Sequence, residues 1–291
     1  GISTNPESFA VYGSRKYFTD KKRGCVLRLS SGTGGGNGIT EISSYGMHDF
    51  FRDELANATK IVGGWNSHTK DYVLSIQGAK VAPLPTNPVS YEGYKTVTFD
   101  EGVLGWTSFS SYKPSYSFSL SNVFYTFNED ADIDGNLGIL YQHYLGPYAK
   151  FYGITYPSDV TIVLNSNPSV VKNFKTINYE GGPGWELESM VASSSDQTLP
   201  IGKYVFQDNL ASLENQIWSN TFKRKEDKYF ANLINNSPAT NGEILFGADM
   251  SGIKGFFSTV KMSISAITQF DTSAIKKELF SVSSDVVESS Y

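Results

Sequence analysis

Apolar and polar residues alternate in four short runs between residues 61 and 112, and this alternation predicts β-strands. The runs read IVGGW, DYVLSIQ, YKTVTFD and GWTSFSSY. Apolar side chains recur at every second position, so each strand has one apolar face; clear examples are Tyr72, Leu74, Ile76, Val97 and Phe99. Four antiparallel strands in about 50 residues match one blade of a β-propeller.

Similar runs precede and follow this unit. Upstream, SFAVYG, KYFTD, CVLRLS and ITEIS predict four more strands, with KKRG as a turn. Downstream, YSFSLSNVFYTFNE predicts a hairpin, followed by a third strand in GILYQHY. Ser121 and Asn122 supply its tight turn, because Asn tolerates a positive φ. The aromatic residues therefore recur at the spacing of propeller blades.

The hairpin carries an unusual density of aromatic side chains. Tyr116, Phe118 and Leu120 share one face of the first strand, and Val123, Tyr125 and Phe127 return on the second. They form either the core between stacked sheets or an exposed platform for a sugar or a base. We favour the core, because large flat side chains fill the space between propeller blades.

The segment YGMHDFFRDELAN predicts a short amphipathic helix at a sheet edge. Met47, Phe50, Phe51 and Leu55 fall on one helical face, and His48 is expected at the surface. LASLENQIWSNTF is the only other candidate helix. Late strands are expected in KGFFSTVKMSI and KELFSVSSDVV.

We therefore predict a mainly β fold with few short helices and two domains. Residues 1–147 form a partial β-propeller of about three blade-like units, and residues 148–291 form a mostly β, sandwich-like domain whose first strands are broken by Pro157. A propeller closes with roughly four to eight blades. The missing blades are expected from upstream sequence or from neighbouring subunits, and the start at Gly1 suggests part of a larger polypeptide.

No catalytic, cofactor-binding or metal-binding residue is predicted, and no cofactor. Ser30–Gly38 is rich in glycine but lacks the Lys-Ser/Thr of a phosphate-binding loop. Asp130–Asn136 begins like a calcium loop, yet its ninth and twelfth positions are Gly138 and Tyr141, so we expect it to fold without calcium. His48, His68 and His143 lack metal-ligand spacing.

Charge and composition limit the kinds of partner and cellular setting that the sequence predicts. The formal net charge is −5, so we expect no specific nucleic-acid partner. The single cysteine, Cys25, excludes an internal disulfide. The sequence contains no run of about 18 apolar residues, so we predict no membrane-spanning helix. The mixed-charge stretch Phe222–Phe230 predicts a solvated edge or loop with local ion pairs, or else an inter-subunit contact.

Several ordered segments together resemble the C-terminal part of a family of tailed-bacteriophage tail, baseplate or nozzle-like virion proteins. They are YFTDKKRGCVLRLS, ISSYGMHDFFRD, TVTFDEGVLGWTSFSSYKPSYSFSLSNVFYTF, FYGITYPSDVTIVLNSNPSVVKNFKTINYEG, FKRKEDKYFANLIN and KELFSVSSDVV. The resemblance implies propeller-type repeats followed by a β domain. It also implies a homo-oligomeric ring around the tail axis, with other tail proteins as partners.

The expected function is therefore structural and not enzymatic. We expect a virion protein of a phage tail that forms an oligomeric scaffold as a nozzle, tail ring or baseplate component, at the DNA-exit or host-facing end. The alternative is a glycan-binding adhesin or polysaccharide depolymerase, in which exposed Tyr or Trp side chains stack on sugars.

Overall fold

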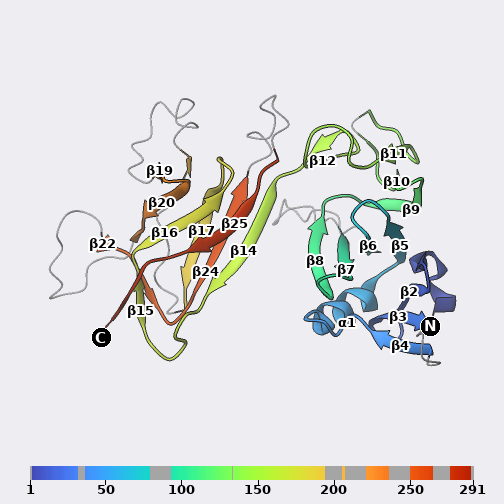
Figure 1. The fold of residues 1–291 in the computed structure, drawn as a ribbon, viewed down its shortest axis with the longest axis horizontal. Coiled ribbons are helices and arrows are strands. Elements are labelled where there is room, and N and C mark those ends of the chain that lie inside the picture. Colours follow the sequence, from blue (N-terminus) through green and yellow to red (C-terminus); the bar gives the residue numbers. More distant parts are fainter. Residues whose placement is uncertain are drawn as a thin grey trace, which may run out of the picture. The chain divides into compact units, whose positions relative to one another are not determined.

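A computed structural model describes residues 2–31, 37–78, 93–132, 134–193, 205–206, 221–235, 250–264 and 276–289. The described chain is mainly β, with a single α-helix, as the alternating sequence pattern predicts. It divides into two compact units (Figure 1). The N-terminal unit comprises residues 1–146 and 150–154, and the C-terminal unit comprises residues 147–149 and 155–291.

Two four-stranded antiparallel sheets begin the N-terminal unit, and each follows chain order. Sheet one contains β1 (Ala10–Tyr12), β2 (Arg15–Asp20), β3 (Cys25–Ser31) and β4 (Asn37–Glu41). Sheet two contains β5 (Lys60–Asn66), β6 (Asp71–Gln77), β7 (Tyr94–Asp100) and β8 (Gly105–Ser110). Two short 3-10 turns, η1 (Ile2–Thr4) and η2 (Pro6–Ser8), precede β1. All eight predicted strands are confirmed.

Sheet three has three strands, β9 (Pro114–Leu120), β10 (Val123–Asn128) and β11 (Leu140–Gln142), in the order β11-β10-β9. Ser121 and Asn122 both have a positive φ, 49° and 65°, as a two-residue hairpin turn requires. The short strands β12 (Lys150–Phe151) and β13 (Ile154–Thr155) follow as a small hairpin.

Sheet two lies between the other two sheets, and every residue of β6 is buried. Tyr72 and Leu74 on one face belong to a core cluster that includes Tyr17 and Val26 of sheet one. Val73, on the opposite face, packs in a second cluster with residues of and around sheet three. The first strand of each sheet also contacts the first strand of the next, β1 with β5 and β5 with β9.

The aromatic face of the hairpin is not the buried face, so our assignment of it to the core is wrong. Tyr116 is 53% exposed and Leu120 is 63% exposed. The serines between them face sheet two instead: Ser117 Oγ donates a hydrogen bond to the Gly63 carbonyl at 3.0 Å. A Cβ on Gly64 would lie 2.2 Å from Ser117 Oγ. Small residues let the backbones approach closely, which leaves the large side chains outside.

Helix α1 (His48–Asn57) lies where the amphipathic pattern predicts it. Phe51 and Leu55 are fully buried, with Met47 and Phe50 packed partly against the same cluster. The Phe51 ring lies 4.4 Å from the Trp106 ring, centroid to centroid, so the helix covers β8 as well as contacting β3. The helix thereby seals one end of the core between sheets one and two.

The C-terminal unit is built from several small sheets, with orders β14-β24-β17, β23-β15-β26, β18-β19-β20-β16-β25 and β21-β22. Their strands are β14 (Ser158–Leu164), β15 (Lys172–Phe174), β16 (Thr176–Gly181), β17 (Glu186–Ala192), β18 (Val205–Phe206), β19 (Thr221–Lys225), β20 (Lys228–Asn232), β21 (Ile234–Asn235), β22 (Met250–Ser251), β23 (Ile253–Gly255), β24 (Ser258–Ile264), β25 (Leu279–Ser283) and β26 (Val286–Glu288). The late strands predicted in the last 40 or so residues correspond to β24, β25 and β26.

One apolar cluster joins the larger sheets of this unit. Tyr179 of β16 and Tyr229 of β20 stack at 4.6 Å, and they share a core with Leu187 of β17 and Met262 of β24. Two sheets that bury their facing sides in one core have a sandwich-like arrangement. The predicted helix at LASLENQIWSNTF lies outside the described residues except for Thr221 and Phe222, which begin strand β19 and are not helical. Most of the Ser30–Gly38 loop also lies outside the described residues.

Candidate interaction surfaces

The acidic loop Asp130–Asn136 is closed by its own hydrogen bonds. Asp132 Oδ1 accepts from the backbone N–H of Asp134 at 2.9 Å and of Asn136 at 2.8 Å. Its Oδ2 accepts from the Tyr141 hydroxyl at 2.7 Å. These donors hold the pKa of Asp132 below its usual value. The carboxylate therefore organises the loop as a turn, with both oxygens occupied by protein donors.

The three histidines lie in different environments. His48 is exposed on α1 beside Asp49, as expected. His68 lies in the β5–β6 turn and stacks on Tyr144 at 4.2 Å. Across the described residues, no three His, Cys, Asp or Glu side chains gather where they could hold a metal ion.

His143, which is half-buried, and Asp71, which is buried, are titratable groups of the N-terminal unit. The His143 ring contacts the Thr126 hydroxyl at 2.8 Å, and desolvation lowers its pKa to about 4. Desolvation raises the pKa of Asp71 to about 6, and the cross-strand neighbour Asp100 adds to the rise. Asp71 Oδ1 has no hydrogen-bond partner within the described residues. Both groups therefore favour their neutral forms.

Glu101 links sheet two to sheet one. It lies in the β7–β8 turn, and its side chain is 10% exposed. It accepts hydrogen bonds of 2.6 Å from the Tyr17 hydroxyl and from Arg28 Nη1, while Arg15 Nη1 lies 3.3 Å away. Charge-assisted contacts of this kind fix the two sheets in one register.

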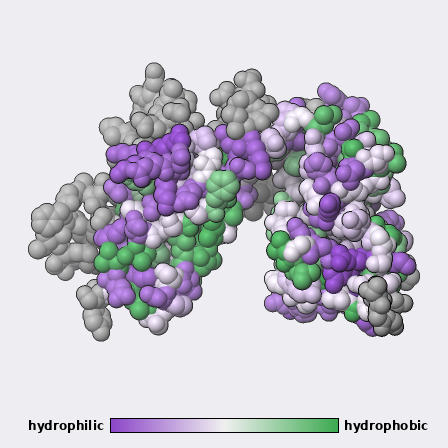
Figure 2. All heavy atoms as spheres, in the orientation of Figure 1, coloured by the Kyte–Doolittle hydropathy of each residue, from purple (hydrophilic) through white to green (hydrophobic). Residues whose placement is uncertain are grey.

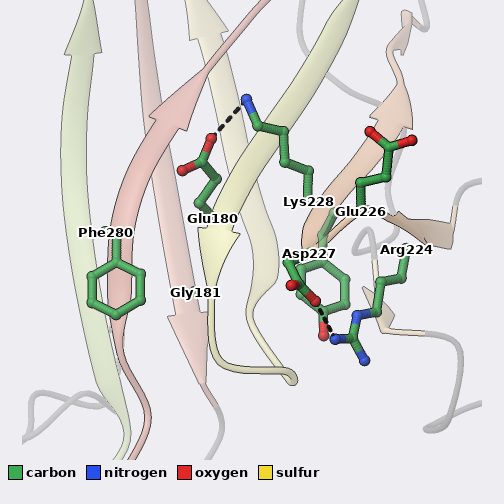
Figure 3. A pocket seen from close by; sticks show the side chains of 8 residues that line it. Glu180, Gly181, Arg224, Glu226, Asp227, Lys228 and Phe280 are labelled. Carbon is green, nitrogen blue, oxygen red and sulfur yellow. Dashed lines mark hydrogen bonds and ion pairs between the residues drawn. The ribbon is translucent and has the colours of Figure 1, made fainter.

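An open pocket of about 420 Å³ lies at the end of the β19–β20 hairpin in the C-terminal unit (Figure 3). Acidic and basic side chains line it and form two ion pairs. Arg224 pairs with Asp227, and Lys228 Nζ lies 2.6 Å from Glu180 on the neighbouring strand. Phe280 of β25 is 72% exposed at its margin. The predicted local ion pairs and the solvation of residues 223–228 are confirmed, but the stretch is a hairpin within the sheet and not an edge or loop, and its Phe222 and Tyr229 are buried.

The outward side of sheet three presents a continuous aromatic face. It consists of Tyr116, Phe118, Leu120, Tyr125, Phe127 and Leu140, which we call the aromatic face. Phe118 stacks on Tyr125 at 5.5 Å, and Phe127 lies opposite both Tyr116 and Leu140 in register. None of the six belongs to a buried cluster of the described chain.

Sheet one presents a second apolar surface on its outward side. Val11, Phe18, Leu27, Leu29 and Ile39 form this surface, which we call the aliphatic face. Val11 is 47% exposed and Ile39 is 64% exposed. Figure 2 shows hydrophobic residues at the surface of both units. Exposed apolar patches of this kind commonly mark interaction sites.

The comparison with known families bears on the C-terminal unit. Residues 146–236 match the family model of the Crassvirus muzzle protein C-terminal domain. This match supports a phage virion structural protein and indicates a component of the virion. The matched residues include the β19–β20 hairpin and amount to less than half of the 291-residue chain. No curated protein matches the sequence.

A membrane-spanning helix needs about 20 apolar residues. No helix in the described part of the chain has that length and hydrophobicity.

Proposed function

We propose that this protein is a structural component of a bacteriophage tail, in a nozzle, tail ring or baseplate. In this role it assembles as an oligomeric scaffold at the DNA-exit or host-facing end and contacts other virion proteins. The observation that carries the proposal is the match of residues 146–236 to a muzzle protein domain. The three successive sheets of the N-terminal unit are proposed as propeller-type blades.

The chemistry of the N-terminal unit supports a scaffold and not an enzyme. Two of its acidic side chains form structural hydrogen bonds: Asp132 closes its loop, and Glu101 joins two sheets. Close serine–glycine contacts hold sheets two and three against each other. The apolar side chains of the aromatic and aliphatic faces, in contrast, lie on outward sides of the unit, where a scaffold contacts its neighbours.

Fractionation of virions tests the proposal. Purified particles carrying this protein are split into capsids and tails, and the protein is quantified in each fraction by mass spectrometry against a major capsid protein. We expect it in the tail fraction, in several copies per particle. Its recovery with capsids, or its absence from particles, would refute a tail role.

A glycan-binding adhesin or depolymerase is the second candidate, and the exposed aromatic face favours it. Tyr116 is exposed beside Phe118, at a ring separation of 6.2 Å, and aromatic rings stack on sugars. A glycan array and a saccharide-release assay, each with wild type and Tyr116→Ala, separate the two candidates. Binding or release that the substitution abolishes supports the adhesin; no signal with any glycan supports the scaffold.

A further inference from the structure

We infer that the aromatic face of sheet three docks on the aliphatic face of sheet one of a second copy, so that copies join head to tail. The inference rests on the proposed function and names the surface that the scaffold would use. Both faces belong to the N-terminal unit, which is a single compact body.

Internal packing shows how this unit covers a sheet face. Strand β6 of sheet two is buried on both sides, with side chains of sheet one on one side and of sheet three on the other. The first strands follow the same order, β1 beside β5 and β5 beside β9. The next step of this stack places a new first strand beside β9 and a new sheet against the aromatic face.

The alternation of strands places the two open faces at opposite ends of the stack. Tyr17 and Val26 point from sheet one toward sheet two, so their neighbours Phe18 and Leu27 point away from it. Ser117 points from sheet three toward β5, so the aromatic face points away. A second copy can therefore repeat the internal stacking by placing its sheet one on that face.

The two faces are chemically complementary. The six members of the aromatic face carry no formal charge, and two of them are tyrosines. The aliphatic face is also apolar, apart from Glu41, the buried Asp20 at the end of β2 and an exposed Lys16 that lies between Val11 and Leu29 in register. A lysine ammonium is attracted to aromatic ring faces. Docking of unlike faces is heterologous, and such contacts build rings when the rotation closes.

Paired face variants of the full chain test this docking. The aromatic-face variant is Tyr116→Arg with Leu120→Arg, and the aliphatic-face variant is Val11→Arg with Ile39→Arg. All four side chains are at least 47% exposed, so we expect the folded chain to tolerate the changes. The matched control is Val103→Arg with Val163→Arg, two exposed valines outside both faces. Circular dichroism and thermal melting verify that each variant folds.

Sedimentation velocity across a wide concentration range is the readout. We expect wild type and control to form the same larger species and each face variant to sediment as a monomer. An equimolar mixture of the two face variants should form a dimer and nothing larger, because it retains one intact aromatic face and one intact aliphatic face per pair.

Three results would overturn the inference: a monomeric wild type, face variants that assemble like the control, or a mixture that stays monomeric. Assembly of one face variant on its own, while the other stays monomeric, indicates like-with-like contacts instead. If the chain is found in virion tails but this test fails, the tail role stands and only the docking is withdrawn.

Discussion

The Tyr17 hydroxyl donates a hydrogen bond of 2.6 Å to Glu101 Oε1 and so joins β2 of sheet one to the β7–β8 turn of sheet two. Burial raises the pKa of Tyr17, and the hydrogen bond to Glu101 adds to the rise. Arg28 occupies the other carboxylate oxygen. The turn is therefore held on sheet one by a hydrogen-bonded and nearly buried charge.

Replacing Glu101 by Gln tests this contact. The substitution keeps the shape of the side chain but leaves Arg28 facing a neutral amide. Since hydrogen bonds to charged groups contribute about 1.5–3 kcal/mol, we expect the free energy of unfolding to fall by about 2 kcal/mol. Urea denaturation measures it, and Glu7→Gln at an exposed position is the control. Equal stability of the two variants would mean that the charge contributes nothing.

The pH dependence of stability should contain two opposing contributions. The folded pKa of His143 is about 4, below its unfolded value near 6.5, so its contribution is present above pH 6.5 and is lost as the pH falls toward 4. The folded pKa of Asp71 is about 6, above its unfolded value near 3.8, so its contribution is present below pH 3.8 and is lost as the pH rises through 6.

Single substitutions separate these contributions between pH 4 and pH 6. Relative to wild type, Asp71→Asn should lose stability on acidification, because the opposing effect of His143 remains. His143→Gln should gain stability on acidification. Urea midpoints of all three proteins at pH 4, 5 and 6 measure the slopes. Parallel curves for wild type and both variants would show that neither group has a shifted pKa.

The close packing of Gly64 against Ser117 predicts that a larger residue at position 64 destabilises the protein. A methyl group on Gly64 would lie 2.2 Å from Ser117 Oγ, so Gly64→Ala should destabilise the protein by about 1–3 kcal/mol. Adding Ser117→Gly removes the obstructing atoms and should restore part of the loss, whereas Gly38→Ala meets no atom within 4 Å and serves as the control. A double-mutant cycle by urea denaturation gives the coupling. Zero coupling would contradict the contact.

Calcium should not stabilise the acidic loop. Both oxygens of Asp132 already accept hydrogen bonds, and a bound cation would have to displace them. We expect the same melting temperature with excess chelator and with millimolar calcium. Asp132→Ala should lower the melting temperature equally in both solutions. A rise of several degrees with calcium that this variant abolishes would identify a genuine site.

Much of the N-terminal fold follows from the sequence because its strands alternate regularly and end at turn residues. The strand pattern around Tyr72 places the right side chains in the core. The same rule fails for Tyr116, since alternation shows that a strand has two faces but not which one is covered. The decisive signal was the serine at every second position of β9, together with the Gly63–Gly64 pair of β5.

The links between sheets could not be predicted. Glu101 contacts Tyr17 and Arg28, which lie 84 and 73 positions away in the chain. No local pattern connects such residues, because their approach depends on how the sheets stack. The Asp132 loop shows the same limit: its sequence begins like a calcium loop and lacks the later ligands, but the amide and hydroxyl donors that satisfy the carboxylate are visible only in the folded chain.

A symmetry-resolved electron cryomicroscopy reconstruction of the tail tests the central claim most directly. We expect density for both units of this chain in repeated copies around the tail axis, at the end away from the capsid. A chain located elsewhere on the particle, or present without rotational repetition, would contradict an oligomeric scaffold of the tail.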